Sequence, residues 1–266
     1  WRSMVTHASG MDKDGWAFVI SGSRRWAQEG YFEGTDYGAN SLFASIEKKI
    51  NDKHSINLTT IYAENQRGKS SPNTDEVTQL AGIKYNSYWG WQDGKKRNSR
   101  DKDVEEPIFM LNHFWKIDDR TTLNSGITYQ MGKIGNSRLD FQNADNPDPT
   151  YYRNLPSYFT SQYNLDDYTD WIGDDPLNVA NAAAAKSNFL ANRQINWLEM
   201  YQANKTASGR SAYILYEDRT DDKVLTANTI INSRLSDKVV LNAGVTFKNI
   251  KSHNFANLLD LLGGNF

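Results

Sequence analysis

The sequence contains no cysteine, so neither a disulfide framework nor thiolate chemistry is available to this chain. It contains no run of about 18 apolar residues, which excludes a transmembrane helix. It also lacks a basic excess, because the formal net charge is -2, and a nucleic-acid-binding surface needs cations to neutralise phosphates. These absences exclude a disulfide-stabilised scaffold, a helical membrane protein and a nucleic-acid-binding protein.

Apolar residues are scarce, whereas aromatic residues are plentiful. Hydrophobic residues make up 38% of the 266 residues and the mean hydropathy is -0.71, yet 12% are aromatic, including 8 Trp and 14 Tyr. A polar average with many aromatics is unusual for a globular domain built around a closed apolar core. It is typical of a transmembrane β-barrel, in which alternate strand residues face lipid and aromatic girdles mark both interfaces.

Eight segments have the composition of β-strands, and several show period-two alternation. In the second segment, for example, Trp16, Phe18 and Ile20 share one face. We expect strands at residues 2–9, 15–25, 41–50, 55–64, 108–117, 121–132, 223–235 and 238–250. The aromatic residues that we expect to face lipid or its interfaces are Trp16, Phe18, Phe109, Trp115, Tyr129 and Phe247.

Short turns alternate with long connections along these segments. The turns fall at residues 11–15, 51–54, 117–120 and 236–238, and the long connections at 26–40, 65–107 and 133–222. Structureless connections of this length are rare in compact soluble domains, whereas outer-membrane barrels have short turns on one side and long loops on the other. The pattern predicts an all-β fold, an antiparallel transmembrane β-barrel, with the long loops on the outer face.

The longest connection contains a helical signal of its own. Asp175 and Pro176 are suited to the N-cap and the first helical position, and no Gly or Pro interrupts the following Ala-rich run. We therefore expect a loop helix near residues 176–204.

The sequence indicates no catalytic residue, no metal site and no cofactor. The adjacent carboxylates at 118–119, 174–175 and 221–222 fit turns or opposite strand faces better than acid–base pairs. The four histidines lack the spacing of metal ligands. Residues 12–15 resemble the first half of a calcium loop, but the required later ligands are missing, so a β-turn is expected.

Aromatic and basic residues gather in two of the long connections, where binding residues are expected. Such groups can hold sugars or aromatic chelates, although aromatics also anchor large loops to their neighbours, and both readings stay open. The candidate ligand-binding residues are Trp89, Trp91, Arg97, Tyr151, Tyr152 and Arg153.

Several segments resemble a known family. Residues 16–26, 67–74, 85–91, 135–139 and 146–152 look like the barrel domain of TonB-dependent outer-membrane receptors, in a branch with large loops. The resemblance covers nearly the whole chain. It implies a 22-stranded barrel closed by an N-terminal plug, and uptake of a nutrient across the Gram-negative outer membrane.

In such a receptor, outer-membrane lipid surrounds the barrel, and a TonB-type protein supplies energy through the N-terminal region. Neither a plug nor the TonB-binding segment is recognisable in the sequence, so we expect residues 1–266 to be a partial barrel domain of a longer protein. The nutrient ligand and a surface lipoprotein partner stay open. Two other functions also stay open: a passive porin or adhesin barrel, and a soluble β-rich carbohydrate-active protein.

Overall fold

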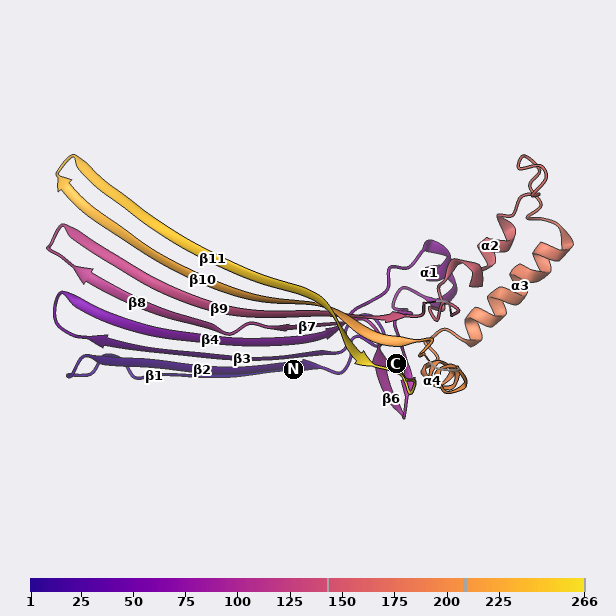
Figure 1. The fold of residues 1–266 in the computed structure, drawn as a ribbon, viewed down its shortest axis with the longest axis horizontal. Helices are drawn as coiled ribbons and strands as arrows, with labels where there is room; N and C mark the ends of the chain where they lie inside the picture. The colour runs from indigo at the N-terminus through magenta and orange to yellow at the C-terminus, as the bar shows by residue number, and fades with distance from the viewer. Residues whose placement is uncertain (143, 208–209, 266) are drawn as a thin grey trace.

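The computed structural model describes residues 1–142, 144–207 and 210–265. Its largest element is one antiparallel sheet, curved along its length in Figure 1. The strands of this sheet are β1 (Arg2–Ala8), β2 (Trp16–Ala27), β3 (Tyr37–Lys49), β4 (His54–Gly68), β7 (Asp101–Glu105), β8 (Ile108–Lys116), β9 (Thr121–Asp140), β10 (Ile214–Ser236) and β11 (Val239–Asp260).

These nine strands fill eight positions in the sheet. Strands β7 and β8 lie one after the other between β4 and β9, separated by Glu106 and Pro107. Proline has no N–H to donate to a ladder, which accounts for a break at this point. The eight predicted strands are therefore confirmed, and most of them extend further toward the long connections than the sequence indicated. The sheet is open, with β1 and β11 at its edges.

The four short turns lie together at one end of the sheet, at the left of Figure 1. Side chains close them: Asp12 Oδ1 accepts from the N–H groups of Asp14 and Trp16 at 2.9 and 2.8 Å. Asn51 Oδ1 accepts in the same way from the two residues at the end of its turn. The oxygens of residues 12–15 thus stabilise a turn, as the sequence predicted.

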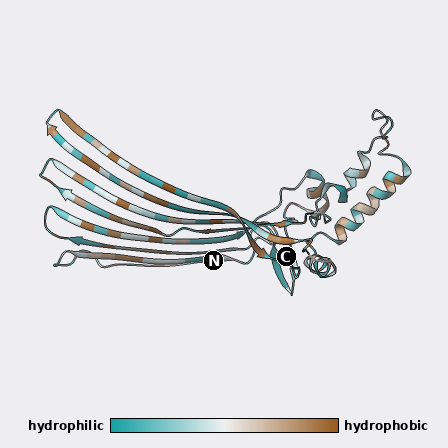
Figure 2. Ribbon diagram, in the orientation of Figure 1, coloured by the Kyte–Doolittle hydropathy of each residue, from teal (hydrophilic) through white to brown (hydrophobic). Residues whose placement is uncertain are grey.

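One face of the sheet is apolar near the short-turn end. The cross-strand register aligns one side chain from each of seven strands in a single row: Phe18, Ile46, Leu58, Leu111, Ile127, Ala227 and Phe247. The aromatic side chains predicted to face lipid share this face, and all of them are exposed or half-buried. Figure 2 shows the alternation as brown and teal bands along the strands.

The opposite face is polar over the same stretch. There Gly126 lies between two asparagines, and a Cβ at this position would approach Asn112 Oδ1 to 2.7 Å and Asn228 Oδ1 to 3.0 Å. Glycine thus leaves room for the amides of both neighbouring strands. The row that contains it is Asn57, Asn112, Gly126, Asn228 and Thr246.

The apolar face becomes charged beyond its apolar rows, toward the long connections. Arg219 pairs with Glu217 at 3.0 Å and with Asp221 at 2.7 Å, and Lys133 lies 3.5 Å from Glu105. The apolar band therefore covers only the part of the sheet near the short turns.

The long connections between β4 and β7 and between β9 and β10 form a separate body beyond the other end of the sheet, at the right of Figure 1. We call residues 69–100 and 141–213 the loop cap. Its elements are α1 (Asp75–Ala81), β5 (Trp89–Gln92), β6 (Lys95–Asn98), η1 (Tyr152–Asn154), α2 (Pro156–Thr160), α3 (Pro176–Ala191) and α4 (Trp197–Thr206).

The helix expected near 176–204 is present as two helices, α3 and α4. Pro176 occupies the first turn of α3 as predicted, but the Asp175 side chain makes no N-cap hydrogen bond. A new helix begins after Asn196, whose Oδ1 accepts from the N–H of Glu199 while its Nδ2 donates to Glu199 Oε2, both at 3.1 Å. This reciprocal pair is a capping arrangement that starts a helix. Across the described residues, no helix is both long and apolar enough to cross a membrane.

The two faces of the sheet predict losses of stability of different size when a charge is added. In the full-length protein folded in lipid vesicles, we expect Ile127→Arg to lower the free energy of unfolding by about 2–4 kcal/mol, because it places a cation on the apolar face near mid-band. Thr128→Arg, one residue away on the polar face, is the matched control and should cost much less. Urea titration measures both, and equal losses would contradict the assignment of the faces.

Candidate functional site

Two small hydrophobic clusters hold the loop cap together. The first cluster brings α1 and α3 into contact with the segment before β5. It consists of Val77, Tyr85, Leu155 and Phe189. Tyr85 packs edge-on against Phe189 with ring centroids 5.7 Å apart, and its hydroxyl donates to the carbonyl of Arg193 at 2.6 Å. Burial raises the pKa of Tyr85, so this hydroxyl keeps its proton and stays a donor.

The second cluster anchors α4 to the end of β11. It consists of Ile195, Trp197, Met200 and Leu262, all buried. Residues from the longest connection are thereby fixed against the sheet.

Asn86 is a polar centre of the cap that the sequence did not single out. Its side chain is fully buried and makes four hydrogen bonds to backbone groups. Oδ1 accepts from the N–H of Ser71 at 2.9 Å and of Tyr88 at 3.1 Å, and Nδ2 donates to the carbonyls of Glu33 at 2.8 Å and Lys69 at 3.1 Å. Asn86 thus ties three segments together. Its place within the aromatic run 85–91 is the only sequence signal for it.

Of the six candidate residues, Trp89 is a packing residue. Only 3% of its surface is exposed, and its ring lies against Gly34, which has a φ of 66° and leaves no room for a Cβ. Lys96 Nζ lies 4.7 Å from its ring centroid. Trp91, by contrast, is 55% exposed and packs edge-on against Trp89 at 5.6 Å. The buried ring therefore holds the exposed ring in place.

Arg97 is also committed to structure. Its guanidinium donates to Asp260 Oδ2 at 2.8 Å and to Gln92 Oε1 at 2.7 Å, and it lies 4.4 Å from the ring of Trp197. Burial alone would raise the pKa of Asp260, but hydrogen bonds from Arg97 and from the N–H of Leu262 hold that pKa below its ordinary value. The Asp260 carboxylate therefore stays ionised at neutral pH, and the ion pair is lost only as the pH falls through this lowered pKa of Asp260.

Tyr152 stands outside the hollow of the cap. It packs edge-on against Tyr151 at 4.9 Å and against Tyr158 at 5.5 Å, and its hydroxyl accepts from Arg153 Nε at 3.0 Å. It positions its two sequence neighbours, both of which border the cavity described next.

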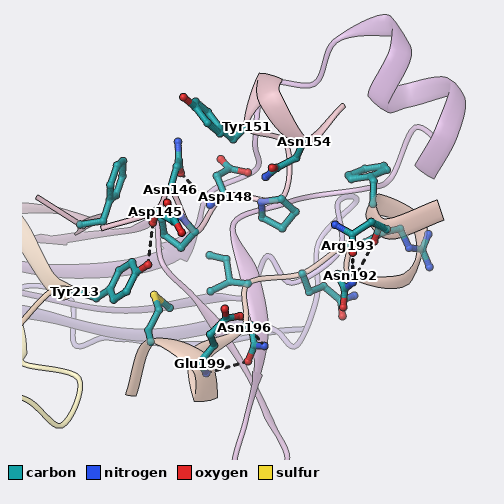
Figure 3. Close-up of a pocket in the computed structure, with 18 of the residues that line it drawn as sticks. Asp145, Asn146, Asp148, Tyr151, Asn154, Asn192, Arg193, Asn196, Glu199 and Tyr213 are labelled. Atoms are coloured by element: carbon teal, nitrogen blue, oxygen red, sulfur yellow. Dashed lines mark hydrogen bonds between the residues drawn. The ribbon is translucent and has the colours of Figure 1, made fainter. Parts of the chain in front are cut away.

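A cavity of about 1140 Å³ opens inside the loop cap, between the segment 141–154 and the α3–α4 region. Three of the six candidates line it: Trp91, Tyr151 and Arg153. Figure 3 shows polar side chains converging on it from both segments. Those labelled there are Asp145, Asn146, Asp148, Tyr151, Asn154, Asn192, Arg193, Asn196, Glu199 and Tyr213.

One wall of the cavity is a rigid polar turn. Asn146 Oδ1 accepts from the N–H of Asp148 at 3.0 Å, and Asp148 Oδ1 accepts from the N–H and hydroxyl of Thr150 at 2.9 and 2.8 Å. Pro147 and Pro149 restrict the backbone between these bonds. The wall is therefore preorganised.

A second ionisable group lies at the base of the cap. Burial, and next the neighbouring carboxylates of Asp36 and Asp103, raise the pKa of Asp101 to about 7. Within the described residues, Asp101 Oδ1 has no hydrogen-bond partner. In the part of the chain that the structure describes, no group of three or more His, Asp or Glu side chains is arranged to hold a metal ion.

Comparison with known proteins finds likeness in structure only. No family model matches the chain, and no curated protein matches it. The open form of the ferric-catecholate import receptor Fiu from E. coli K12 superposes with a TM-score of 0.56 at 10% identity, covering 99% of this chain and 35% of that one. The chain thus shares the fold of about a third of that structure.

Two further solved structures agree. The siderophore receptor PiuA from Acinetobacter baumannii gives a TM-score of 0.53 at 12% identity, covering 95% of this chain and 29% of that one. The closed form of Fiu gives 0.52 at 10% identity, with 100% and 33% covered. The chain thus spans about a third of the length of these receptors. The predicted resemblance to the barrel of TonB-dependent receptors is confirmed at the level of the fold.

The Arg97 contacts predict a local change in the loop cap. Arg97→Met keeps the aliphatic stem but removes the bonds to Asp260 and Gln92, so we expect the opening free energy of the β5–β6 hairpin to fall by about 1.5–3 kcal/mol. Amide hydrogen exchange of the full-length protein measures it. Lys95→Met, at an exposed position on the same hairpin, is the control, and equal protection in the two variants would refute the role of Arg97.

The raised pKa of Asp101 predicts a pH effect. A carboxyl that binds its proton more tightly in the folded state stabilises that state at low pH. This contribution is lost as the pH rises from 3.8, the ordinary pKa of an Asp, through about 7, the pKa of Asp101 in the folded protein. We expect Asp101→Asn to flatten the stability profile over this window and to be the more stable protein at pH 8. Unfolding midpoints at several pH values test this, and an unchanged slope would show that Asp101 is not the group responsible.

Proposed function

We propose that this chain forms part of the wall and the loop cap of an outer-membrane import receptor, a binding and transport protein without enzymatic turnover. The apolar face would lie against outer-membrane lipid of a Gram-negative cell, and the polar face would line the barrel interior. The loop-cap cavity would bind a nutrient ligand on the outer side.

The observation that carries the proposal is the seven-strand apolar row with a polar row directly behind it. A sheet of this kind suits a wall between lipid and water, because each strand alternates apolar-out and polar-in. The loop cap lies at the end opposite the short turns, as expected for the outer end of such a barrel.

The open edges β1 and β11 support a larger barrel. Unpaired strand edges are not viable in hydrocarbon, because every backbone polar group there needs a partner. We propose that further strands close the wall, as the family resemblance implies, and that residues 1–266 are a partial barrel domain. A plug and a TonB-type energy-coupling partner would belong to the rest of the protein, and a surface lipoprotein is an untested further partner.

The proposal is tested on the full-length protein in isolated outer membranes. We expect it to resist extraction by alkaline carbonate, and to be captured by the purified periplasmic domain of the host's TonB-type protein. Release by carbonate would overturn the membrane assignment. A steady conductance in planar bilayers, without capture by the energy-coupling domain, would show a passive porin instead.

A further inference from the structure

The cavity in the loop cap has a composition that selects among ligand classes. Resting on the proposed import function, we propose that it binds a neutral polyhydroxylated ligand, an oligosaccharide of several sugar units, rather than a ferric catecholate chelate. The argument uses the charge of the lining, its amides, its aromatic rings and its size.

The charge of the lining does not suit a multiply charged anion. Three carboxylates border the cavity, those of Asp145, Asp148 and Glu199, against two guanidinium groups, those of Arg153 and Arg193. The lining thus carries one net negative charge. A ferric tris-catecholate carries several negative charges and would be repelled by such a surface, whereas a neutral ligand pays no such penalty.

Amide side chains are unusually frequent in the lining. An amide offers both a donor and an acceptor, which matches a sugar hydroxyl, itself both donor and acceptor. Among the described residues, the side chains of Asn154 and Gln194 make no hydrogen bond, and the Asn146 amide nitrogen donates none, so these groups are available to a ligand. The six amides of the lining are Asn146, Asn154, Asn188, Asn192, Gln194 and Asn196.

Two aromatic rings complete the match. Trp91 and Tyr151 both border the cavity, and each is held edge-on by a neighbour that does not, Trp89 and Tyr152 respectively. A ring fixed in this way at the cavity provides a flat apolar surface for the C–H face of a sugar ring, at little cost in side-chain entropy.

The carboxylates have a role in the same chemistry. Asp148 uses only Oδ1 within its own turn, and no hydrogen bond within the described residues involves the Asp145 carboxylate, which Figure 3 places at the cavity. An ionised carboxylate accepts two hydrogen bonds side by side, which suits adjacent hydroxyls. The negative charge that disfavours an anionic chelate therefore favours a polyol.

The size of the cavity sets the scale of the ligand. At about 1140 Å³ it exceeds the range of about 300–1,000 Å³ typical of pockets for drug-sized molecules. A single sugar would leave most of the lining unused, so the cavity suits an oligomer.

The test measures binding to the purified full-length receptor by titration calorimetry. The probes are neutral malto-, cello-, xylo- and chito-oligosaccharides of four to eight units, with ferric enterobactin as the anionic chelate. We expect saturable binding of one oligosaccharide series, with a Kd that stays within twofold as salt is raised from 50 to 500 mM, because no net charge on the ligand is screened.

Matched variants locate the binding. Tyr151→Ala and Trp91→Ala should each weaken oligosaccharide binding by about tenfold, equivalent to about 1.4 kcal/mol. Tyr168→Ala, at an exposed tyrosine outside the cavity, and Trp171→Ala, at an exposed tryptophan outside the cavity, should leave the Kd unchanged. Circular dichroism of each variant shows that the fold is retained.

Binding of ferric enterobactin that Tyr151→Ala weakens, with no oligosaccharide binding, would overturn the inference while leaving an import receptor in place. Binding of no probe, or oligosaccharide binding unaffected by either cavity variant, would overturn it as well. Failure of the proposed function is distinct, since it is read from carbonate extraction and from capture by the energy-coupling domain rather than from calorimetry.

Discussion

The register of the antiparallel ladder is the constraint on which the rest of the molecule depends. Because strand side chains alternate between faces, a slip of one residue between β8 and β9 would move Ile127 to the polar face and Thr128 to the apolar one. Gly126 helps fix that register, since only a residue without Cβ fits between the amides of Asn112 and Asn228. The alignment of eight strand positions also brings the ends of the long connections together. The register of the sheet therefore determines where the segments of the loop cap begin and end in space.

Within the cap, a few buried polar groups determine which side chains are free to meet a ligand. Asn86 and Arg97 make their hydrogen bonds to neighbouring segments, and the Trp89 side chain is buried by packing. The candidate residues Trp91, Tyr151 and Arg153, by contrast, border the cavity. Each aromatic-basic cluster therefore contains both residues that pack within the cap and residues that border the cavity.

How much of this was predictable from sequence depends on whether a signal is local. The eight strands and the polar turns follow from alternation and from Asp and Asn side chains that close turns on themselves. The short strands β5 and β6 were missed, because four residues such as Lys95–Asn98 are too few for a periodic pattern. The split after α3 had a local signal, Asn196 followed by Glu199, that the Ala-rich run obscured. Whether Trp89 or Trp91 faces the cavity depends on Gly34 and β6, which no local pattern reveals.

If the sheet is the proposed membrane wall, strands β9, β10 and β11 are much longer than a bilayer requires. Strand β10 has 23 residues, which at about 3.3 Å per residue and a tilt near 40° rise roughly 55 Å, against an apolar band about 25 Å tall. Around half of the wall formed by these three strands would therefore stand above the hydrocarbon as a hydrophilic collar. A ligand captured in the cavity would be held tens of ångströms from the bilayer, above the headgroup layer, and would have to descend a tall water-filled shaft before reaching the membrane plane.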